Sequence, residues 1–234
     1  MILLDRFVAG PDECAYLPER QSRMEYEIVA RLSPEEYEAR INQGWRKFGH
    51  LLFHPICDAC TECRPLRVPV ARFSPDRSQR RAAKRNADLT VRRAWPTVDA
   101  ARLALYRRYH AAQTLRRGWP AAEKSAEEYA FSFVQNPLPS VEITLWEGDA
   151  LRAVVLTDIT PNTVSAVYHY HEPDCRDRGL GTFTLLQAIE LARRLGKPFL
   201  HLGYHVAGCG SMAYKARFRP CEILGADGVW REEP

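Results

Sequence analysis

Hydrophobic positions in the second half of the chain recur with the spacings of regular structure. We expect a helix over residues 99–116, where apolar and aromatic side chains return at three- and four-residue steps. A further helix is predicted from the Ser125–Glu128 capping box to about Val134, ending before Asn136-Pro137. Alternating or continuous apolar runs predict strands at 141–146, 151–157, 164–170, 199–204 and 221–224, with a helix over 179–195 among them.

The first half of the chain is patterned less regularly. Alternation predicts a strand over 24–30, and Ser33-Pro34-Glu35-Glu36 combines an N-cap, a first-turn proline and a capping box, which begin a helix that ends near Gly44. A strand is predicted over 45–53 and a short one over 67–70. Helices and mostly antiparallel strands in this order predict an α+β fold, with any domain boundary near residues 93–98.

Positive charge is concentrated in one segment. Residues 72–93 hold seven Arg and one Lys against two Asp, a net of +6, whereas the whole chain is 33 − 29 = +4. Charge this local favours a polyanionic partner, RNA in particular, and the Ser, Gln and Asn residues within it can also bond phosphate or ribose. The alternative is a solvated basic loop or helix, because the segment shows no apolar face.

Three cysteines precede this segment at a three-residue step, Cys57, Cys60 and Cys63. Two residues between ligands allow a turn to place both sulfurs on one ion, and Cys14 would supply a fourth ligand. A zinc ion or an iron–sulfur cluster is therefore one interpretation. The other is a loop of reduced thiols, since zinc sites normally carry a second, distant CxxC pair.

Length and composition narrow the class of protein. The chain has 234 residues, 46% of them hydrophobic and 26% charged, as in a globular protein that buries a core. It has no apolar run long enough to span a membrane and no secretory signal at its start, so we expect a cytoplasmic protein without membrane contact. Reduced cysteines are expected there.

The order of elements after residue 99 resembles that of the N-acetyltransferase (GNAT) superfamily. The turn Arg176-Asp177-Arg178-Gly179-Leu180-Gly181 fits that superfamily's Arg/Gln-x-x-Gly-x-Gly loop. Its glycines allow backbone N–H groups to face a pyrophosphate at the start of a helix. The resemblance implies a GNAT-like, mainly antiparallel sheet flanked by helices.

Four segments more specifically resemble the aminoacyl-tRNA–protein transferases, the bacterial aspartate/glutamate leucyltransferases and the arginyltransferases. They are Cys14-Ala15-Tyr16-Leu17-Pro18, Gly44-Trp45-Arg46-Lys47-Phe48-Gly49, the stretch from Cys57 to Leu89 with its Ser78-Gln79-Arg80-Arg81, and the stretch from Leu202 to Glu222 with its Tyr214-Lys215-x-x-Phe218-x-Pro220. The cysteine trio and Leu17-Pro18 look closer to the leucyl branch. Two features depart from the family pattern: Ser211 stands where a basic residue is usual, and the helix over 105–117 lacks a second His.

The resemblance implies a cytoplasmic, monomeric aminoacyltransferase. It would move leucine from leucyl-tRNA to the α-amine of proteins that begin with Asp or Glu and so mark them for degradation through the N-degron pathway. It also implies two parts: a cysteine-containing N-terminal subdomain over 1–95, which carries the basic segment, and a GNAT-like transferase domain over 96–234. The alternatives are an arginyl-tRNA donor, an acetyl-coenzyme A-dependent N-acetyltransferase and a non-catalytic RNA-binding module.

Aminolysis of an aminoacyl ester needs positioning and removal of a proton from an ammonium. No Ser/His/Asp or Gly-x-Ser-x-Gly arrangement is present, which fits direct attack, with no cofactor needed for the chemistry. The catalytic candidates lie at strand ends, although each His alone is more often structural. They are Tyr168, His169, His171, Tyr204 and His205.

An acidic acceptor favours a bidentate Arg, and the donor favours basic and glycine-rich segments. The candidates for the acceptor carboxylate are Arg77, Arg80 and Arg178. The candidates for tRNA are Arg80, Arg81, Lys84, Arg85, Asn86, Arg176, Gly179, Gly181 and Lys215.

Overall fold

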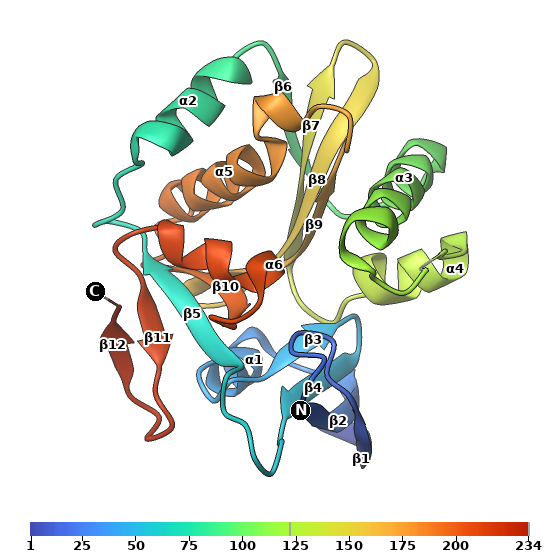
Figure 1. The fold of residues 1–234 in the computed structure, drawn as a ribbon, viewed down its shortest axis with the longest axis vertical. Helices are drawn as coiled ribbons and strands as arrows, with labels where there is room; N and C mark the ends of the chain where they lie inside the picture. The colour runs from blue at the N-terminus through green and yellow to red at the C-terminus, as the bar shows by residue number, and fades with distance from the viewer. Residues whose placement is uncertain (122, 234) are drawn as a thin grey trace.

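The computed structural model describes residues 1–121 and 123–233 and contains a four-stranded and an eight-stranded sheet (Figure 1). The strands are β1 (Ile2–Glu13), β2 (Gln21–Arg31), β3 (Arg46–Phe48), β4 (Leu51–Pro55), β5 (Arg64–Pro69), β6 (Thr90–Ala94), β7 (Ser140–Glu147), β8 (Ala150–Ile159), β9 (Thr163–His171), β10 (Phe199–His205), β11 (Glu222–Leu224) and β12 (Trp230–Glu232). The α-helices are α1 (Pro34–Ile41), α2 (Arg77–Arg85), α3 (Ala100–Arg117), α4 (Ala126–Tyr129), α5 (Leu180–Arg194) and α6 (Gly210–Ala213). The π-helical turn η1 spans Ala130–Val134, and the 3-10 turns η2 and η3 span Arg176–Arg178 and Tyr214–Arg217.

The smaller sheet has the order β1-β2-β4-β3, and all its pairs are antiparallel. Helix α1 begins at the predicted capping box of Ser33 and Glu36 and buries Tyr37 and Ile41 against this sheet. The single strand predicted over 45–53 is wrong. The chain turns at Gly49, whose φ is +53°, so β3 and β4 form a hairpin instead.

The larger sheet has the order β12-β11-β5-β10-β9-β8-β7-β6. Every neighbouring pair is antiparallel except β9 and β10, which run parallel. Helices α2 and α5 lie on one face and α3 and α4 on the other (Figure 1). The predicted α+β class, a mainly antiparallel sheet flanked by helices, is confirmed.

Strand pairing crosses the predicted division at residues 95 and 96. Strand β5 lies between β10 and β11, and β6 forms the opposite edge of the same sheet. Both strands come from the first 95 residues. The N-terminal part thus contributes strands to the larger sheet, while the division itself stays a prediction.

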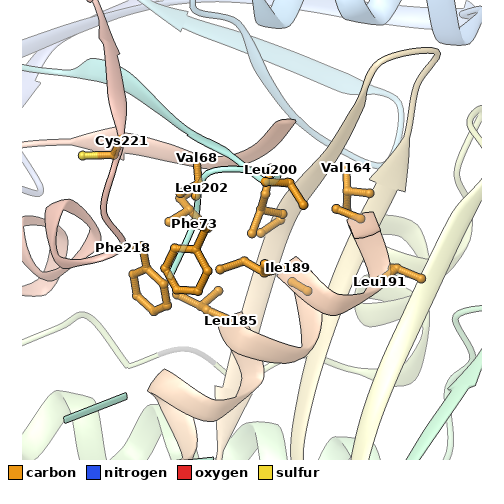
Figure 2. Close-up of a cluster of buried hydrophobic side chains, with 14 of the residues drawn as sticks. Val68, Phe73, Val164, Leu185, Ile189, Leu191, Leu200, Leu202, Phe218 and Cys221 are labelled. Carbon is orange, nitrogen blue, oxygen red and sulfur yellow. The ribbon is translucent and has the colours of Figure 1, made fainter. Parts of the chain in front are cut away.

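The main core lies between α5 and the sheet (Figure 2). Leu185 and Ile189 of α5 pack there with Val164 of β9, Leu200 of β10 and Phe218, which follows η3. A second core on the opposite face joins α3 to β8 and β9 through aromatic side chains, among them Tyr106, Tyr129 and Tyr170. The two cores hold β8 and β9 between them.

The basic segment is a helix rather than a loop. Asp76 caps α2 in a capping box with Gln79, and Gln79 Nε2 donates to the carbonyl of Arg217 at 3.0 Å. Gln79 and Ala82 are buried, and Asn86 after the helix is fully buried. This narrow face fixes α2 to the protein, and its basic side chains are left exposed. Within the described residues no helix is long and apolar enough to cross a membrane.

Candidate active site

The parallel pair of β9 and β10 opens into a fork. Backbone pairing joins Phe199 to Thr163, Leu200 to Val164 and His201 to Ser165. Both strands then continue, to His171 and His205, without further pairing to each other among the described residues. Side chains of other segments therefore reach the strand ends beyond Ser165 and His201. We call this region the β9–β10 fork.

A register shift decides where the histidines of β9 point. The β8–β9 ladder shifts between Leu156 and Thr157, opposite the middle of β9. Beyond the shift, Tyr168 and Tyr170 pack with the aromatic core of α3, whereas His169 and His171 face the start of α5. A Cβ on Gly181 would lie 3.2 Å from His171 Nε2 and 3.8 Å from His169 Cε1, so this glycine permits the close approach.

His169 is enclosed by hydrogen-bonding side chains. Its Nε2 is hydrogen-bonded to Tyr214 Oη at 2.9 Å, and its Nδ1 lies 3.5 Å from Thr184 Oγ1. Burial, followed by nearby His171 and Lys215, lowers the pKa of His169 to about 3. The imidazole is therefore neutral at pH 7, which suits a positioning group more than a strong base.

The other catalytic candidates do not gather around His169. Tyr168 Oη is hydrogen-bonded to His110 Nε2 at 2.8 Å on the α3 face, and burial raises the pKa of Tyr168 well above its usual value. Tyr204 Oη donates to the carbonyl of Gly44 at 2.8 Å and is buried. His205 is buried, its Nδ1 makes no hydrogen bond to the described residues, and burial lowers its pKa. Of the five candidates, the structure brings His169 and His171 together.

Two residues that the sequence did not indicate as catalytic candidates contact the candidates directly. His110 and Tyr214 supply the hydrogen-bond partners of Tyr168 and His169. Tyr214 lies in the Tyr-Lys-x-x-Phe-x-Pro segment, which was a usable signal. The only sequence signal for His110 is its place in the three- and four-residue spacing of the helix over 99–116, and this spacing is equally typical of a core residue.

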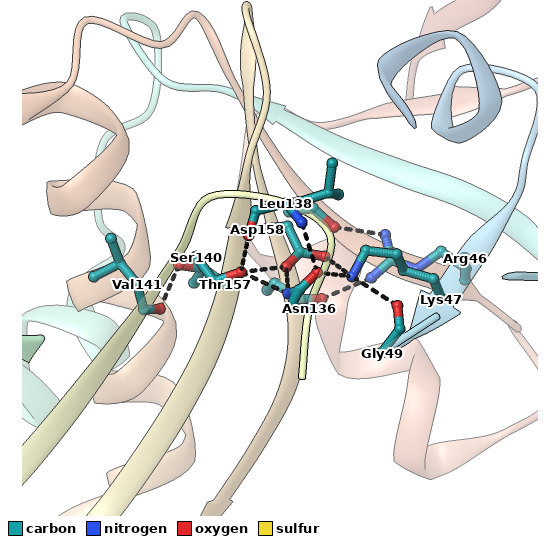
Figure 3. A network of polar contacts seen from close by, with 11 residues as sticks. Arg46, Lys47, Gly49, Asn136, Leu138, Ser140, Val141, Thr157 and Asp158 are labelled. Carbon is teal, nitrogen blue, oxygen red and sulfur yellow. Dashed lines mark hydrogen bonds and ion pairs between the residues drawn. The ribbon is translucent and has the colours of Figure 1, made fainter. Parts of the chain in front are cut away.

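A buried arginine closes the base of the fork. Arg46 Nη1 donates to Ser165 Oγ at 3.1 Å and Nη2 to the carbonyl of Ala166 at 2.7 Å (Figure 3). On the other side, a Cβ on Gly203 of β10 would lie 3.5 Å from Arg46 Nε and Nη2. Gly203 has φ +81°, at a register shift of β10 against β5, so the backbone there makes room for the guanidinium. Arg46 is 7% exposed.

Lys215, a tRNA candidate, lies in the interior beside this arginine. Its Nζ donates to the carbonyl of Tyr204 at 2.7 Å and to Met212 Sδ at 3.4 Å, and the residue is 9% exposed. Burial, followed by the charge of Arg46, lowers the pKa of Lys215 to about 7. Arg46 lies against Gly203, and Lys215 Nζ is bonded to the carbonyl of Tyr204, so the two basic groups are held at neighbouring residues of β10.

Most of the remaining basic candidates form one exposed surface on α2 and η2. The exposed members are Arg77, Arg80, Arg81, Lys84, Arg85 and Arg176. Arg178 is instead a structural link: it is paired with Asp88 and Glu147, and its Nε donates to Asn86 Oδ1 at 3.1 Å. Gly179, at φ +69°, begins α5 directly behind it. Asn86 is fully buried, and its Nδ2 donates to the carbonyls of Ala82 and Arg178.

The four candidate metal ligands lie in one neighbourhood. Burial, followed by Cys14, Cys57 and Cys60, raises the pKa of Cys63 to about 12. Arg20 Nη1 donates to Cys60 Sγ at 3.1 Å, and the Arg23 amide donates to Cys57 Sγ at 3.4 Å. As these side chains stand, no three His, Cys, Asp or Glu of the described chain are placed to hold a metal ion.

Comparison with known proteins identifies the family. Residues 12–81 match the N-terminal model of the arginine-tRNA-protein transferases, and residues 101–225 match the C-terminal model. An aspartate/glutamate leucyltransferase of Halorhodospira halophila is 37% identical over 222 residues, which cover 94% of each chain. Those of Campylobacter jejuni and Stenotrophomonas maltophilia are 34% and 38% identical, covering 93% and 92% of this chain and 92% and 88% of theirs.

Among solved structures, FemX aligns with a TM-score of 0.49 at 10% identity, covering 86% of this chain and 79% of its own. The two family models together account for most of the sequence, and the relatives match it over nearly its whole length. The chain belongs to the arginine-tRNA-protein transferase family, the family in which the aspartate/glutamate leucyltransferases fall.

Proposed function

We propose that this protein transfers leucine from leucyl-tRNA to the α-amine of proteins and peptides that begin with Asp or Glu. One observation carries the proposal: relatives named aspartate/glutamate leucyltransferase are 34–38% identical over almost the entire chain. Family membership makes the protein an aminoacyltransferase. An acetyl-coenzyme A-dependent N-acetyltransferase and a non-catalytic RNA-binding module are accordingly set aside.

The chemistry asks little of the protein beyond positioning. The amine nitrogen attacks the ester carbonyl, the C–O bond to the tRNA ribose breaks, and the amine proton passes to the departing hydroxyl or to solvent. An α-amino group has a pKa of about 7.7–8.0, so an appreciable fraction is already the neutral nucleophile near pH 7. A weakly basic imidazole such as His169, held by Tyr214, can therefore suffice to orient the attacking amine.

The donor is expected on the exposed basic face of α2. Arg80, Arg81, Lys84 and Arg85 all lie there in solvent, where they can follow a phosphate backbone. Arg85 also donates to the carbonyl of Asp177, which ties α2 to the turn before α5. A tRNA bound across α2 would thus reach the start of α5, the element that His169 and His171 face.

Arginine as the donor amino acid is the second candidate, because the matching family models bear the name of the arginyl enzymes. The test is transfer by purified protein with leucyl-tRNA, arginyl-tRNA and acetyl-coenzyme A as alternative donors and a Glu-initiated peptide as acceptor. Leucyl transfer at least about tenfold above the other two is expected. Preference for arginyl-tRNA, or for the coenzyme A ester, contradicts the proposal.

Four further properties complete the proposal. The protein works as a monomer in the cytoplasm, marks acceptors for degradation, and carries a zinc ion or an iron–sulfur cluster on Cys14, Cys57, Cys60 and Cys63. Metal and sulfide analysis of protein purified without oxygen tests the last point, with a Cys60→Ser variant as control. Equal metal content in both proteins would contradict it.

A further inference from the structure

Buried cations in this protein fall into two groups. Lys47 is paired with Asp158 at 2.9 Å, and Arg102 is paired with Glu142, all four side chains lying in the interior. Arg46 and Lys215 are buried to the same extent but have no carboxylate partner within residues 1–121 and 123–233. Figure 3 shows Lys47 in a polar network around Asp158, with Arg46 beside it. The acceptors of Arg46 are neutral oxygens of Ser165 and Ala166.

An unpaired buried charge is costly. Moving one ion from water into the interior is strongly unfavourable even after the surroundings relax, and a second like charge nearby adds to the penalty. The lowered pKa of Lys215, caused by burial and then by Arg46, reports the same penalty. A protein keeps such a pair at the base of the β9–β10 fork most readily when an anion from outside compensates the charge.

The two side chains still have donors to offer. Each terminal nitrogen of Arg46 donates one hydrogen bond, Nη1 to Ser165 and Nη2 to Ala166. The other N–H groups of the planar guanidinium remain available as donors. Lys215 Nζ donates to a backbone carbonyl and to a sulfur, which is a weak acceptor. A charged oxygen would readily replace the sulfur as the acceptor. A planar carboxylate matches a guanidinium with a second cation beside it.

We propose that Arg46 and Lys215 form the subsite that receives the side-chain carboxylate of the acceptor's first residue. The inference rests on the proposed leucyl transfer and names its acceptor pocket. It moves acceptor recognition away from Arg178, which is already held by Asp88 and Glu147, and away from the exposed Arg77 and Arg80.

The position of Arg46 and Lys215 favours the acceptor carboxylate, rather than a tRNA phosphate, as the anion that they bind. In Asp or Glu only a few covalent bonds separate the carboxylate from the α-nitrogen, so its subsite must adjoin the point of transfer. Lys215 follows Tyr214, the hydrogen-bond partner of His169, and the charge of Lys215 acts on His169. A slender side chain can enter where both cations are more than nine-tenths buried, whereas a phosphodiester backbone suits the exposed arginines of α2.

The test compares peptides that differ only in charge. Leucyl transfer is measured with Glu-Ala-Ala against Gln-Ala-Ala, and with Asp-Ala-Ala against Asn-Ala-Ala, for wild type, Arg46→Gln, Arg46→Lys and Lys215→Met. Arg194→Gln is the matched control, since Arg194 is an exposed arginine paired with Glu190 on α5. Affinity for tRNA is measured in parallel, and circular dichroism confirms that each variant is folded.

In wild type the acidic peptides should be strongly preferred. Arg46→Gln and Lys215→Met should lower kcat/KM for them about ten- to a hundredfold, as expected for a lost charge-assisted contact, while transfer to the amide peptides and affinity for tRNA stay within about threefold. Arg46→Lys should fall between, and Arg194→Gln should match wild type. If both Arg46→Gln and Lys215→Met keep the wild-type preference for acidic over amide peptides, the inference is overturned. Weaker tRNA binding with selectivity intact assigns the cations to the donor instead.

A second measurement needs neither variants nor turnover. Reductive methylation of wild-type protein, followed by peptide mapping, reports the accessibility of the Lys215 amine. Saturating Glu-Ala-Ala should slow labelling of Lys215 about tenfold relative to Gln-Ala-Ala, while exposed Lys84 labels equally with both peptides. Equal labelling of Lys215 overturns the inference. If protection is seen but leucine is transferred to neither peptide, the subsite stands and the proposed donor fails.

Discussion

Helix α2 and the β9–β10 fork both gather positive charge, but in opposite environments. The arginines of α2 stand in water, held by a narrow buried face of Gln79, Ala82 and Asn86. Arg46 and Lys215 are enclosed by strands and lack carboxylate partners in the described chain. Solvated charges can bind any phosphate of a nucleic-acid backbone, and salt weakens this binding. Buried charges instead distinguish a charged ligand from its neutral analogue.

The largest expected effect tests whether the partnered and unpartnered buried cations really differ. Lys47→Met leaves the Asp158 carboxylate buried and unpaired, which should lower the free energy of unfolding by about 3–5 kcal/mol. Arg46→Met removes a charge that no carboxylate balances, so its cost should be clearly smaller. Urea denaturation measures both. Adding Asp158→Leu to Lys47→Met should recover much of the lost free energy of unfolding. Equal destabilisation by Lys47→Met and Arg46→Met would contradict the distinction between buried cations with and without a carboxylate partner.

A second effect separates the two regions by salt. If Arg80 and Arg85 neutralise phosphates, the plot of log affinity for tRNA against log salt should flatten by roughly 0.7–0.9 per lost contact in the Arg80→Ala/Arg85→Ala double variant. Arg46→Gln should leave the slope unchanged. Binding titrations from low to moderate salt give both slopes. A flatter slope in Arg46→Gln would place the fork on the path of the tRNA.

Disrupting the anchor of α2 should have a smaller effect. Asp76→Ala removes the side chain that caps the helix and accepts from the Gln79 amide at 2.7 Å, and should cost about 1 kcal/mol of unfolding free energy. Affinity for tRNA should fall only modestly, because the cations remain. Asp76→Asn keeps a capping side chain and is the control. Loss of tRNA binding with unchanged stability would mean that Asp76 acts on the donor directly.

Acid should act on the buried region and spare the exposed helix. Burial, followed by Lys124, lowers the pKa of His110 to about 4, below the value of about 6.5 for an unfolded chain. Between these values the unfolded state binds more protons, so stability is lost as pH falls from about 6.5 toward 4. His110→Asn should make this dependence shallower in urea midpoints measured across that range, whereas Arg80→Ala should leave it as in wild type.

Helices and central strands were predictable because local signals agreed with the fold. The caps at Ser33 and Ser125 begin helices as expected, and the long apolar periodicities gave α3, α5 and the strands from β7 to β10. The elements missed were edge strands. In β1 almost every side chain is exposed, so no alternation marks it, and β6 and β12 are short edges of the larger sheet.

The sequence by itself determined the fold class, the family and the basic surface, since these rest on local periodicity, on motifs and on charge that is contiguous in the chain. Only the tertiary structure decided which charges are solvated and which are buried. Arg178 looked as available as Arg77 until its pairing with Asp88 and Glu147 was seen. Arg46 of β3 and Lys215 of η3 come near each other because both side chains bond to the backbone of the β9–β10 fork. Burial, which no single segment encodes, sets what a charge can bind.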